Sequence, residues 1–223
     1  MRPLPQNTTV VLLAAGHGKR MRPLTDHTPK PLLRIGAHAL IEHHLLTLAD
    51  LGFNNVVINT AYLGHKIQSH LGSGEQFGLN ISYSDESETG ALETAGGLKK
   101  ALPLIQSDAF ICINADVWTD FNFTKLLAPL KKAGRIALVP NPNHNPDGDF
   151  LLDHSEQSLT FSGIALYNKS IFTNLPDGKQ ALGPILKKMV LDNKLETMSL
   201  DAQWTDVGTP ERLAILNAAF NKE

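Results

Sequence analysis

The feature that most constrains this sequence is an alternation of short apolar runs with segments of helical character. Five runs are predicted to be strands, at 9–15, 56–59, 79–84, 109–114 and 135–140. The segments between them are predicted to be helices, at 40–51, 63–71, 94–102 and 123–133. A repeated strand–helix order is typical of an α/β fold whose mainly parallel sheet is covered on both faces. Ligands of such sheets bind beyond the carboxyl ends of the strands.

The rhythm changes after residue 140. Residues 141–149 are polar and rich in turn-forming residues. Short strands are expected near 150–153 and 159–167, then a helix near 182–191, a strand near 196–200 and a last helix from Pro210. With 223 residues, the chain fits one domain, 1–223. We expect two halves within it, residues 1–140 and residues 141–223.

The first predicted strand runs directly into Gly16-x-Gly18 and a basic cluster of Lys19, Arg20, Arg22 and Lys30. Glycines let backbone N–H groups approach an anion closely, and Lys and Arg side chains add the charge that a polyphosphate needs. Gly-x-Gly alone also fits an ordinary strand-to-loop turn. The P-loop pattern fails here, and Met21 stands where the dinucleotide fingerprint needs its third glycine.

Overall composition excludes several classes. The formal net charge is −2, which argues against a general nucleic-acid binder, whereas residues 1–34 carry a net +5. No apolar run approaches the length of a membrane span, so no membrane partner is expected. Cys112 stands alone inside an apolar run and is expected to be buried, which leaves no disulfide and fits a cytoplasmic protein. The adjacent His43 and His44 lack the spacing of a helical metal-ligand pair.

Two aspartates stand out as candidate metal ligands. Asp116 follows the fourth predicted strand, and Asp206 precedes the last predicted helix. Mg²⁺ takes only one or two protein carboxylates and completes its shell with water and phosphate oxygens. Considered alone, Asp116 fits a turn residue and Asp206 a helix cap equally well.

The run from residue 13 to residue 31 resembles the signature of the sugar-1-phosphate nucleotidylyltransferases, L-A-A-G-x-G-x-R-x-x-P-L-T-x-x-x-P-K-P. Every fixed position of that pattern is present. The resemblance implies a three-layer α-β-α, Rossmann-like fold of the nucleotide-diphospho-sugar transferase type (GT-A-like), with a mainly parallel mixed central sheet. It also implies a Mg²⁺-dependent transfer between a nucleoside triphosphate and a sugar 1-phosphate. Residues 1–140 would then form a nucleotide-binding half and residues 141–223 a sugar-phosphate-binding half.

The resemblance further implies the residues of the site. Arg20 would hold the departing phosphates and Lys30 would neutralise the α-phosphate and the incoming sugar phosphate. The motifs N-x-D and W-x-D-x-G-T imply Asp116 and Asp206 as metal ligands. The nucleotide-binding set is Ala14, Ala15, Gly16, Gly18, Lys30, Glu93, Thr94 and Gly97. The sugar-phosphate-binding set is Asn114, Asp149, Ser162 and Gly163. The segment around Glu93 also fits a plain helix start, and that around Gly163 an ordinary strand.

Further segments resemble one branch of the family, the short bacterial enzymes that join UTP to N-acetylmuramic acid 1-phosphate in recycling of cell-wall sugar. These segments cover 114–120, 141–152, 159–164 and 204–213. Ala39 departs from the branch, where proline is usual. Glucose, mannose or a choline phosphate remains an alternative acceptor, and a non-catalytic nucleotide sensor remains an alternative from another class. No β-helix or acyltransferase segment follows residue 223, so a monomer is expected.

Overall fold

The computed structural model describes residues 3–152 and 155–220, and its centre is a mixed sheet. Within these residues the sheet has eight strands, seven of them in the order β11-β8-β10-β6-β1-β4-β5, with β9 paired to β10. The strands are β1 (Val10–Leu13), β4 (Asn55–Thr60), β5 (Asn80–Asp85), β6 (Ala109–Asn114), β8 (Gly134–Val139), β9 (Phe150–Leu151), β10 (Ser158–Asn168) and β11 (Leu195–Ser199). The predicted strand near 150–153 is therefore β9, and residue 153 lies outside the described residues.

The sheet is parallel except where β10 enters it. The pairs β1–β4, β1–β6, β4–β5 and β8–β11 are parallel, whereas β10 runs antiparallel to both β6 and β8. The predicted mainly parallel, mixed sheet is confirmed. In the central register, Leu13 lies opposite Asn59 on one side and Asn114 on the other. Polar side chains at the carboxyl ends of β4 and β6 therefore lie on either side of the end of β1, where α/β sheets bind ligands.

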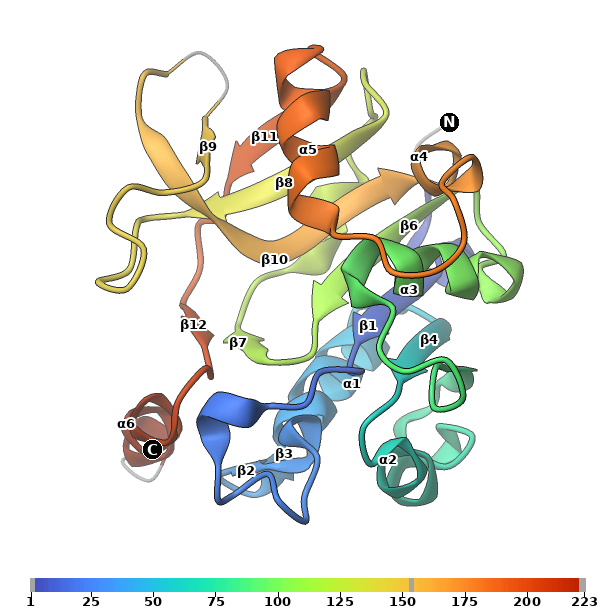
Figure 1. Cartoon of the computed structure of the whole chain (residues 1–223), viewed down its shortest axis with the longest axis vertical. Helices are drawn as coiled ribbons and strands as arrows, with labels where there is room; N and C mark the ends of the chain where they lie inside the picture. Colours follow the sequence, from blue (N-terminus) through green and yellow to red (C-terminus); the bar gives the residue numbers. More distant parts are fainter. Residues whose placement is uncertain (1–2, 153–154, 221–223) are drawn as a thin grey trace.

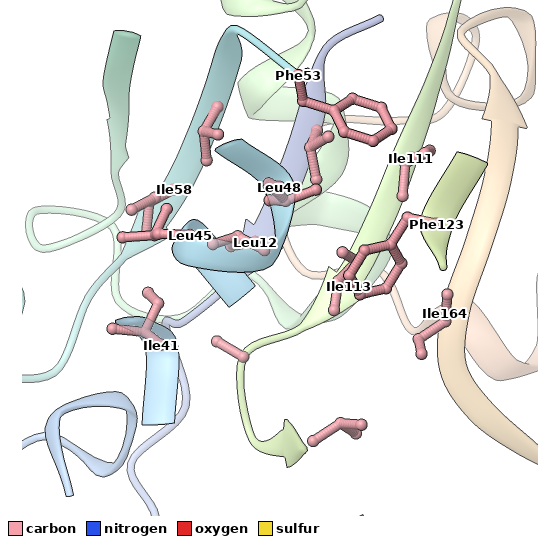
Figure 2. Packing of buried hydrophobic residues seen from close by; sticks show 14 of the residues in the cluster. Leu12, Ile41, Leu45, Leu48, Phe53, Ile58, Ile111, Ile113, Phe123 and Ile164 are labelled. Carbon is pink, nitrogen blue, oxygen red and sulfur yellow. The ribbon is translucent and has the colours of Figure 1, made fainter. Parts of the chain in front are cut away.

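One face of the sheet is covered by α1 (Leu40–Asp50) and α2 (Gly64–Leu71). Ile41, Leu45 and Leu48 recur at helical spacing on α1 and are fully buried. Figure 2 shows them packed over Leu12 and Ile58 of the sheet. Fully burying an aliphatic side chain of this size stabilises the fold by roughly 1.5–3 kcal/mol, so this seam holds α1 against the sheet.

The opposite face is covered by α3 (Glu93–Ala101), α4 (Ser170–Thr173) and α5 (Leu182–Leu191) (Figure 1). Leu98 of α3, Phe172 of α4 and Leu186 of α5 pack with the strand residues that point to this side. Cys112 faces the same cluster and is buried, as predicted. Helices on both faces of one sheet give the predicted three layers.

The predicted helix at 123–133 is wrong. The structure has only a short 3-10 helix there (Phe123–Leu127), followed by an irregular segment. Pro129 cannot donate a helical hydrogen bond. The guanidinium of Arg135 donates instead to the carbonyls of Leu126 and Ala128, 2.9 Å away in each case. The segment therefore bonds to a side chain of β8 rather than to itself.

Two small sheets lie beside the main one. The strand β7 (Val117–Thr119) pairs antiparallel with β12 (Trp204–Asp206), and β2 (Arg34–Ile35) pairs with β3 (His38–Ala39). The last helix, α6 (Pro210–Phe220), lies beyond β12 and near β2 (Figure 1). It buries Leu213 and Leu216 against Met21 and Leu40. No helix in the described part of the chain is long and apolar enough to cross a bilayer.

Candidate active site

A hollow of about 360 Å³ opens where β1, β4 and β6 end. We call it the first hollow, and its size is in the range of small-molecule sites. The predicted site residues that line it are Ala14, Ala15, Gly16, Gly18, Arg20, Lys30, Glu93, Thr94, Asn114 and Asp116. The strand ends therefore bring together residues that are separated by up to a hundred positions in the sequence.

The rim of the first hollow is a tight glycine turn. Gly18 has φ +61°, in the left-handed region that favours glycine. A Cβ at Gly18 would lie 3.0 Å from Thr25 Cγ2 and 3.2 Å from Lys30 Cβ. The Thr25 hydroxyl donates to the carbonyl of Gly18 at 2.9 Å. Glycine is needed here both for its conformation and for close packing of the basic loop.

Lys30 and Asp116 meet in the first hollow. Pro29 and Pro31 flank Lys30, whose side chain is only 9% exposed. Its Nζ lies 2.6 Å from Oδ2 of Asp116, an aspartate that is 40% exposed and follows β6. Such a charge-assisted contact holds the amine in place at the edge of the glycine turn.

His44 holds β7, the strand after Asp116, in place. This side chain of α1 is buried, and its Nε2 lies 2.7 Å from the carbonyl oxygen of Val117. Burial lowers the pKa of His44 to about 4, so the ring is neutral at pH 7. His44 is thus a structural anchor for the Asp116 turn.

A buried polar network behind the first hollow escaped the sequence-based prediction. Asn59 Oδ1 accepts from the backbone N–H of Ala14 at 2.7 Å, and its Nδ2 donates to Glu86 Oε1 at 2.8 Å. Glu86 is fully buried, and its Oε2 accepts from the N–H of Leu92 at 2.8 Å. The network ties the end of β1 to the loop before α3. The one available signal was a polar residue, Asn59, at the end of an apolar strand.

Gly97 contributes to this network rather than to the wall of the first hollow. A Cβ at Gly97 would lie 2.7 Å from Glu86 Oε1 and 2.9 Å from Asn59 Nδ2.

Glu93, at the start of α3, has φ +59°, and the N–H groups of Ala95 and Gly96 both donate to the carbonyl of Gln180. A backbone strained in this way persists only where its surroundings hold it.

The predicted sugar-phosphate residues divide into two groups. Asn114 lines the first hollow, whereas Asp149, Ser162 and Gly163 do not. Gly163 has φ +78°, and a Cβ there would lie 2.6 Å from Nδ2 of Asn114, so this glycine makes room for the Asn114 side chain. The buried Ser162 hydroxyl donates to the carbonyl of Ala137, and the exposed Asp149 accepts from the N–H of Phe161. Their roles toward a sugar stay predictions.

Asp206 lies close to Asp116 through the backbone. The pairing of β7 with β12 places Asp206 opposite Val117, and the N–H of Val207 donates to the carbonyl of Asp116 at 2.8 Å. Oδ2 of Asp206 accepts from Arg212, and its Oδ1 lies 3.5 Å from Nε2 of His144. The sequence did not predict either contact.

Asp206 lines a second hollow of about 540 Å³, which we call the second hollow. It lies between the turn after β8, β12 and the start of α6. Its lining residues are Val139, Pro140, Pro142, Asn143, His144, Trp204, Thr205, Asp206 and Arg212. Gly208 lines the first hollow, and a Cβ there would lie 3.1 Å from Oδ2 of Asp206. Asp206 therefore stands where the two hollows approach each other.

The charge of the first hollow bears on what it can hold. Lys19, Arg20 and Lys30 line it together with Glu86, Glu93 and Asp116, so the formal charges cancel. No cluster of three metal-ligating side chains occurs within residues 3–152 and 155–220. Asp116 lines the first hollow and Asp206 the second, so their role as a pair of metal ligands stays a prediction.

Comparison with known proteins gives three kinds of match. The family model described as "Nucleotidyl transferase" matches residues 9–150. The chain is 44% identical to the N-acetylmuramate alpha-1-phosphate uridylyltransferase of Neisseria meningitidis serogroup B, over 91% of this chain and 94% of that protein. It is 31% identical to the mannose-1-phosphate guanyltransferase of Gibberella zeae, over 90% of this chain and only 61% of that longer protein. The crystal structure of HddC from Yersinia pseudotuberculosis complexed with GMP-PN is similar with a TM-score of 0.79 and 22% identity, over 96% of this chain and 99% of that one.

Proposed function

The chain belongs to the nucleotidyl transferase family, and from this premise we propose that it joins UTP and N-acetylmuramic acid 1-phosphate. The products are UDP-N-acetylmuramic acid and pyrophosphate, which places the reaction in the recycling of cell-wall sugar. The proposal draws its nucleotide and acceptor from the relative that is 44% identical over nearly the full length of both proteins. We place the enzyme in the cytoplasm, where UTP is made and used, and we keep the prediction of a monomer.

The reaction needs no protein nucleophile, because the acceptor phosphate is already an anion at neutral pH. An oxygen of the sugar phosphate attacks the α-phosphorus of UTP, and the bond from that phosphorus to the bridging oxygen of the β-phosphate breaks. Pyrophosphate leaves with the bond electrons. Catalysis of this kind consists of positioning the reactants and stabilising charge.

The lining residues of the first hollow supply both effects. We assign Lys30 to the α-phosphate and the incoming phosphate, since its amine is held at a fixed place by Asp116. Arg20 is exposed at the rim and forms no ion pair with any described residue, so its planar guanidinium is available to the departing phosphates. The backbone of residues 14–18 would receive the remaining phosphate oxygens.

A divalent cation, Mg²⁺ in our proposal, would be held by the carboxylates of Asp116 and Asp206 and would neutralise charge on the triphosphate. Both carboxylates are now paired with cationic side chains, Asp116 with Lys30 and Asp206 with Arg212. Each of these cations therefore also keeps a carboxylate oriented in the absence of a ligand.

The observation that carries the proposal is the 2.6 Å contact of Lys30 with Asp116 beside the glycine turn. It joins the two ends of the predicted site across 86 positions of sequence. Had the structure placed these groups on different surfaces, the transfer mechanism would have had to be abandoned.

The test is a panel of nucleoside triphosphates and sugar 1-phosphates, with pyrophosphate release as the readout. We expect UTP with N-acetylmuramic acid 1-phosphate to give the highest kcat/KM. The Gibberella zeae relative makes GTP with mannose 1-phosphate the leading rival pair. Preference for that pair, or for glucose 1-phosphate or phosphocholine, would replace the substrates but keep the reaction. Binding of UTP without turnover across the whole panel would support a nucleotide sensor instead.

A further inference from the structure

The second hollow contains a cation that the reaction described above does not use. Arg212 lies in the first turn of α6, and its side chain is 23% exposed. Its Nη1 contacts Asp206 and lies 3.3 Å from Nε2 of His144. No described residue accepts a hydrogen bond from the Nε or Nη2 of Arg212. A guanidinium that lies in a hollow with unused donors can bind a further anion.

The position of Arg212 relates the second hollow to the first. A Cβ at Gly208 would lie only 2.9 Å from Nη2 of Arg212, so glycine at this position leaves the guanidinium its space. Gly208 itself lines the first hollow. An anion on Nη2 would therefore lie beside the first hollow, close enough for one molecule to extend into both hollows.

The rest of the second hollow is suited to a small organic group rather than to a free ion. Val139, Pro140 and Pro142 form one apolar side of it. Trp204 forms another, and its ring is fixed because Nε1 donates to the carbonyl of Ser162 at 2.9 Å. Rigid apolar walls with one convergent charged group are typical of a site that orients a small ligand.

We propose that the second hollow binds a carboxylate-bearing arm of the acceptor sugar, with Arg212 as the carboxylate anchor and His144 as a second polar contact. The inference rests on the proposed function, because N-acetylmuramic acid differs from N-acetylglucosamine by a lactyl ether that carries one carboxylate and one methyl group. The fork of a guanidinium matches a carboxylate, and the apolar walls match the methyl group. Arg212 thus selects the acceptor, whereas Lys30 and Asp116 act on every acceptor alike.

A competing account is that Arg212 only positions Asp206. A two-by-two experiment separates the two accounts. The wild-type protein and Arg212→Met are each assayed with N-acetylmuramic acid 1-phosphate and with its carboxamide, which keeps the shape of the arm but removes the charge. Initial rates of pyrophosphate release give kcat/KM, and calorimetry gives the affinity for the two matching UDP-sugars without any turnover.

We expect the wild type to prefer the acid over the amide by roughly 10- to 100-fold, as for a charged hydrogen bond with partial solvent access. In Arg212→Met the preference should fall to about twofold or less, because the charged guanidinium that distinguishes the acid from the amide is gone. Arg212→Lys, which keeps the charge without the fork, should fall between the two. Arg34→Met is the matched control, because Arg34 is an exposed arginine that lines neither hollow. This variant should keep the wild-type preference for the acid.

Three outcomes would overturn the inference. First, equal kcat/KM values of the wild type for the acid and the amide would by themselves exclude a carboxylate anchor. An Arg212→Met protein that loses both substrates in equal proportion makes Arg212 a positioning residue for Asp206. If Arg212→Met does not fold, Arg212→Lys takes its place, and a preference for the acid that is unchanged in Arg212→Lys excludes the guanidinium fork as the carboxylate anchor. Failure of the proposed function looks different, because the wild type would then turn over another sugar 1-phosphate but not the acid.

Discussion

The two hollows are built in different ways. The first lies at the ends of β1 and β6, where a glycine turn sets the backbone and charged side chains complete the lining, and buried hydrogen bonds through Asn59 and Glu86 support it. The second is lined by a turn, a short strand and a helix start, and its charged groups, Asp206 and Arg212, are each 23% exposed. Backbone geometry tolerates few residue types, whereas a side-chain-lined wall can change one residue at a time. The comparison therefore indicates a fixed site for nucleotide chemistry beside an adjustable site for the acceptor.

The strongest way to break the first hollow is to remove its central ion pair. Lys30→Ala and Asp116→Ala should each lower kcat by at least about 100-fold, the usual effect of losing one preorganised charge-stabilising group. Both residues line the hollow, so the loss of turnover should far exceed any change in thermal unfolding.

The matched control for this pair is Lys188→Ala on α5. That lysine is 78% exposed and pairs only with Asp192 within the described residues. Its loss should leave the rate of pyrophosphate release unchanged. Near-wild-type turnover in Lys30→Ala or Asp116→Ala would contradict the assignment of the first hollow as the transfer site.

Much of the first hollow was readable from the sequence, because it depends on local backbone requirements. Gly18 must adopt a positive φ, the prolines fix Lys30, and a polar residue after a buried strand marks the ligand-binding edge. The mainly parallel sheet and its cover of helices on both faces followed from the alternation of apolar runs, whereas the order of the strands in the sheet was not predicted. The predicted helix at 123–133 failed because Arg135, a residue of the next strand, takes the carbonyls that a helix would use. No local pattern shows such a contact.

The walls of the second hollow were not predictable for the same reason. Arg212 meets His144 across 68 positions, and the N–H of Val207 reaches the carbonyl of Asp116 only because two short strands pair. Neither strand is long enough to give a periodic signal. The network of Asn59 and Glu86 is also long-range, since Glu86 lies in a loop with no sequence feature that marks it as buried.

The second prediction addresses the support of the first hollow. Glu86→Gln replaces one acceptor oxygen by an amide group, so one of the two donors that face it, Asn59 Nδ2 or Leu92 N–H, loses its partner. At a fully buried site this should lower the free energy of unfolding by roughly 2–4 kcal/mol and weaken UTP binding.

Urea denaturation and calorimetric titration with UTP give both quantities. Glu88→Gln is the matched control, because the same change is made two positions away at an exposed residue. Equal stability of the two variants would show that the buried network does not hold the hollow together.

The third prediction concerns His44, which anchors the strand after Asp116. Its pKa is about 4 in the folded protein and 6.5 as a free side chain, so the unfolded chain binds more protons between these values. The contribution of His44 to stability is therefore complete above about pH 6.5 and is lost as the pH falls toward 4, by about 2 kcal/mol at pH 5.

Urea denaturation at pH 7.5 and pH 5 measures this loss. His44→Gln keeps a donor for the carbonyl of Val117 but cannot titrate, so its stability should fall less between the two pH values. Other groups with shifted pKa values, such as Glu42 and His43, contribute equally to both proteins and cancel in the difference. An identical pH dependence in wild type and variant would refute a buried neutral imidazole.

The prediction with the smallest expected effect compares two arginines of the basic loop. It tests whether catalysis depends on the position of each cation or only on the total charge of the loop. Arg20 lines the first hollow, whereas Arg22, two residues later, is 64% exposed and pairs with Asp26 at 3.2 Å. An exposed pair of this kind contributes about 0–1 kcal/mol to stability, and Arg22→Gln should change the KM for UTP by less than about threefold. Arg20→Gln removes the same charge from the same loop and should lower kcat/KM far more. Two results together would contradict this expectation: an equal loss of activity in both variants, and no difference from wild type in 0.5 M salt. The loop would then act through the total electrostatic potential of its charges rather than through hydrogen-bond donors at fixed positions. The contrast between the two hollows would then lose its basis.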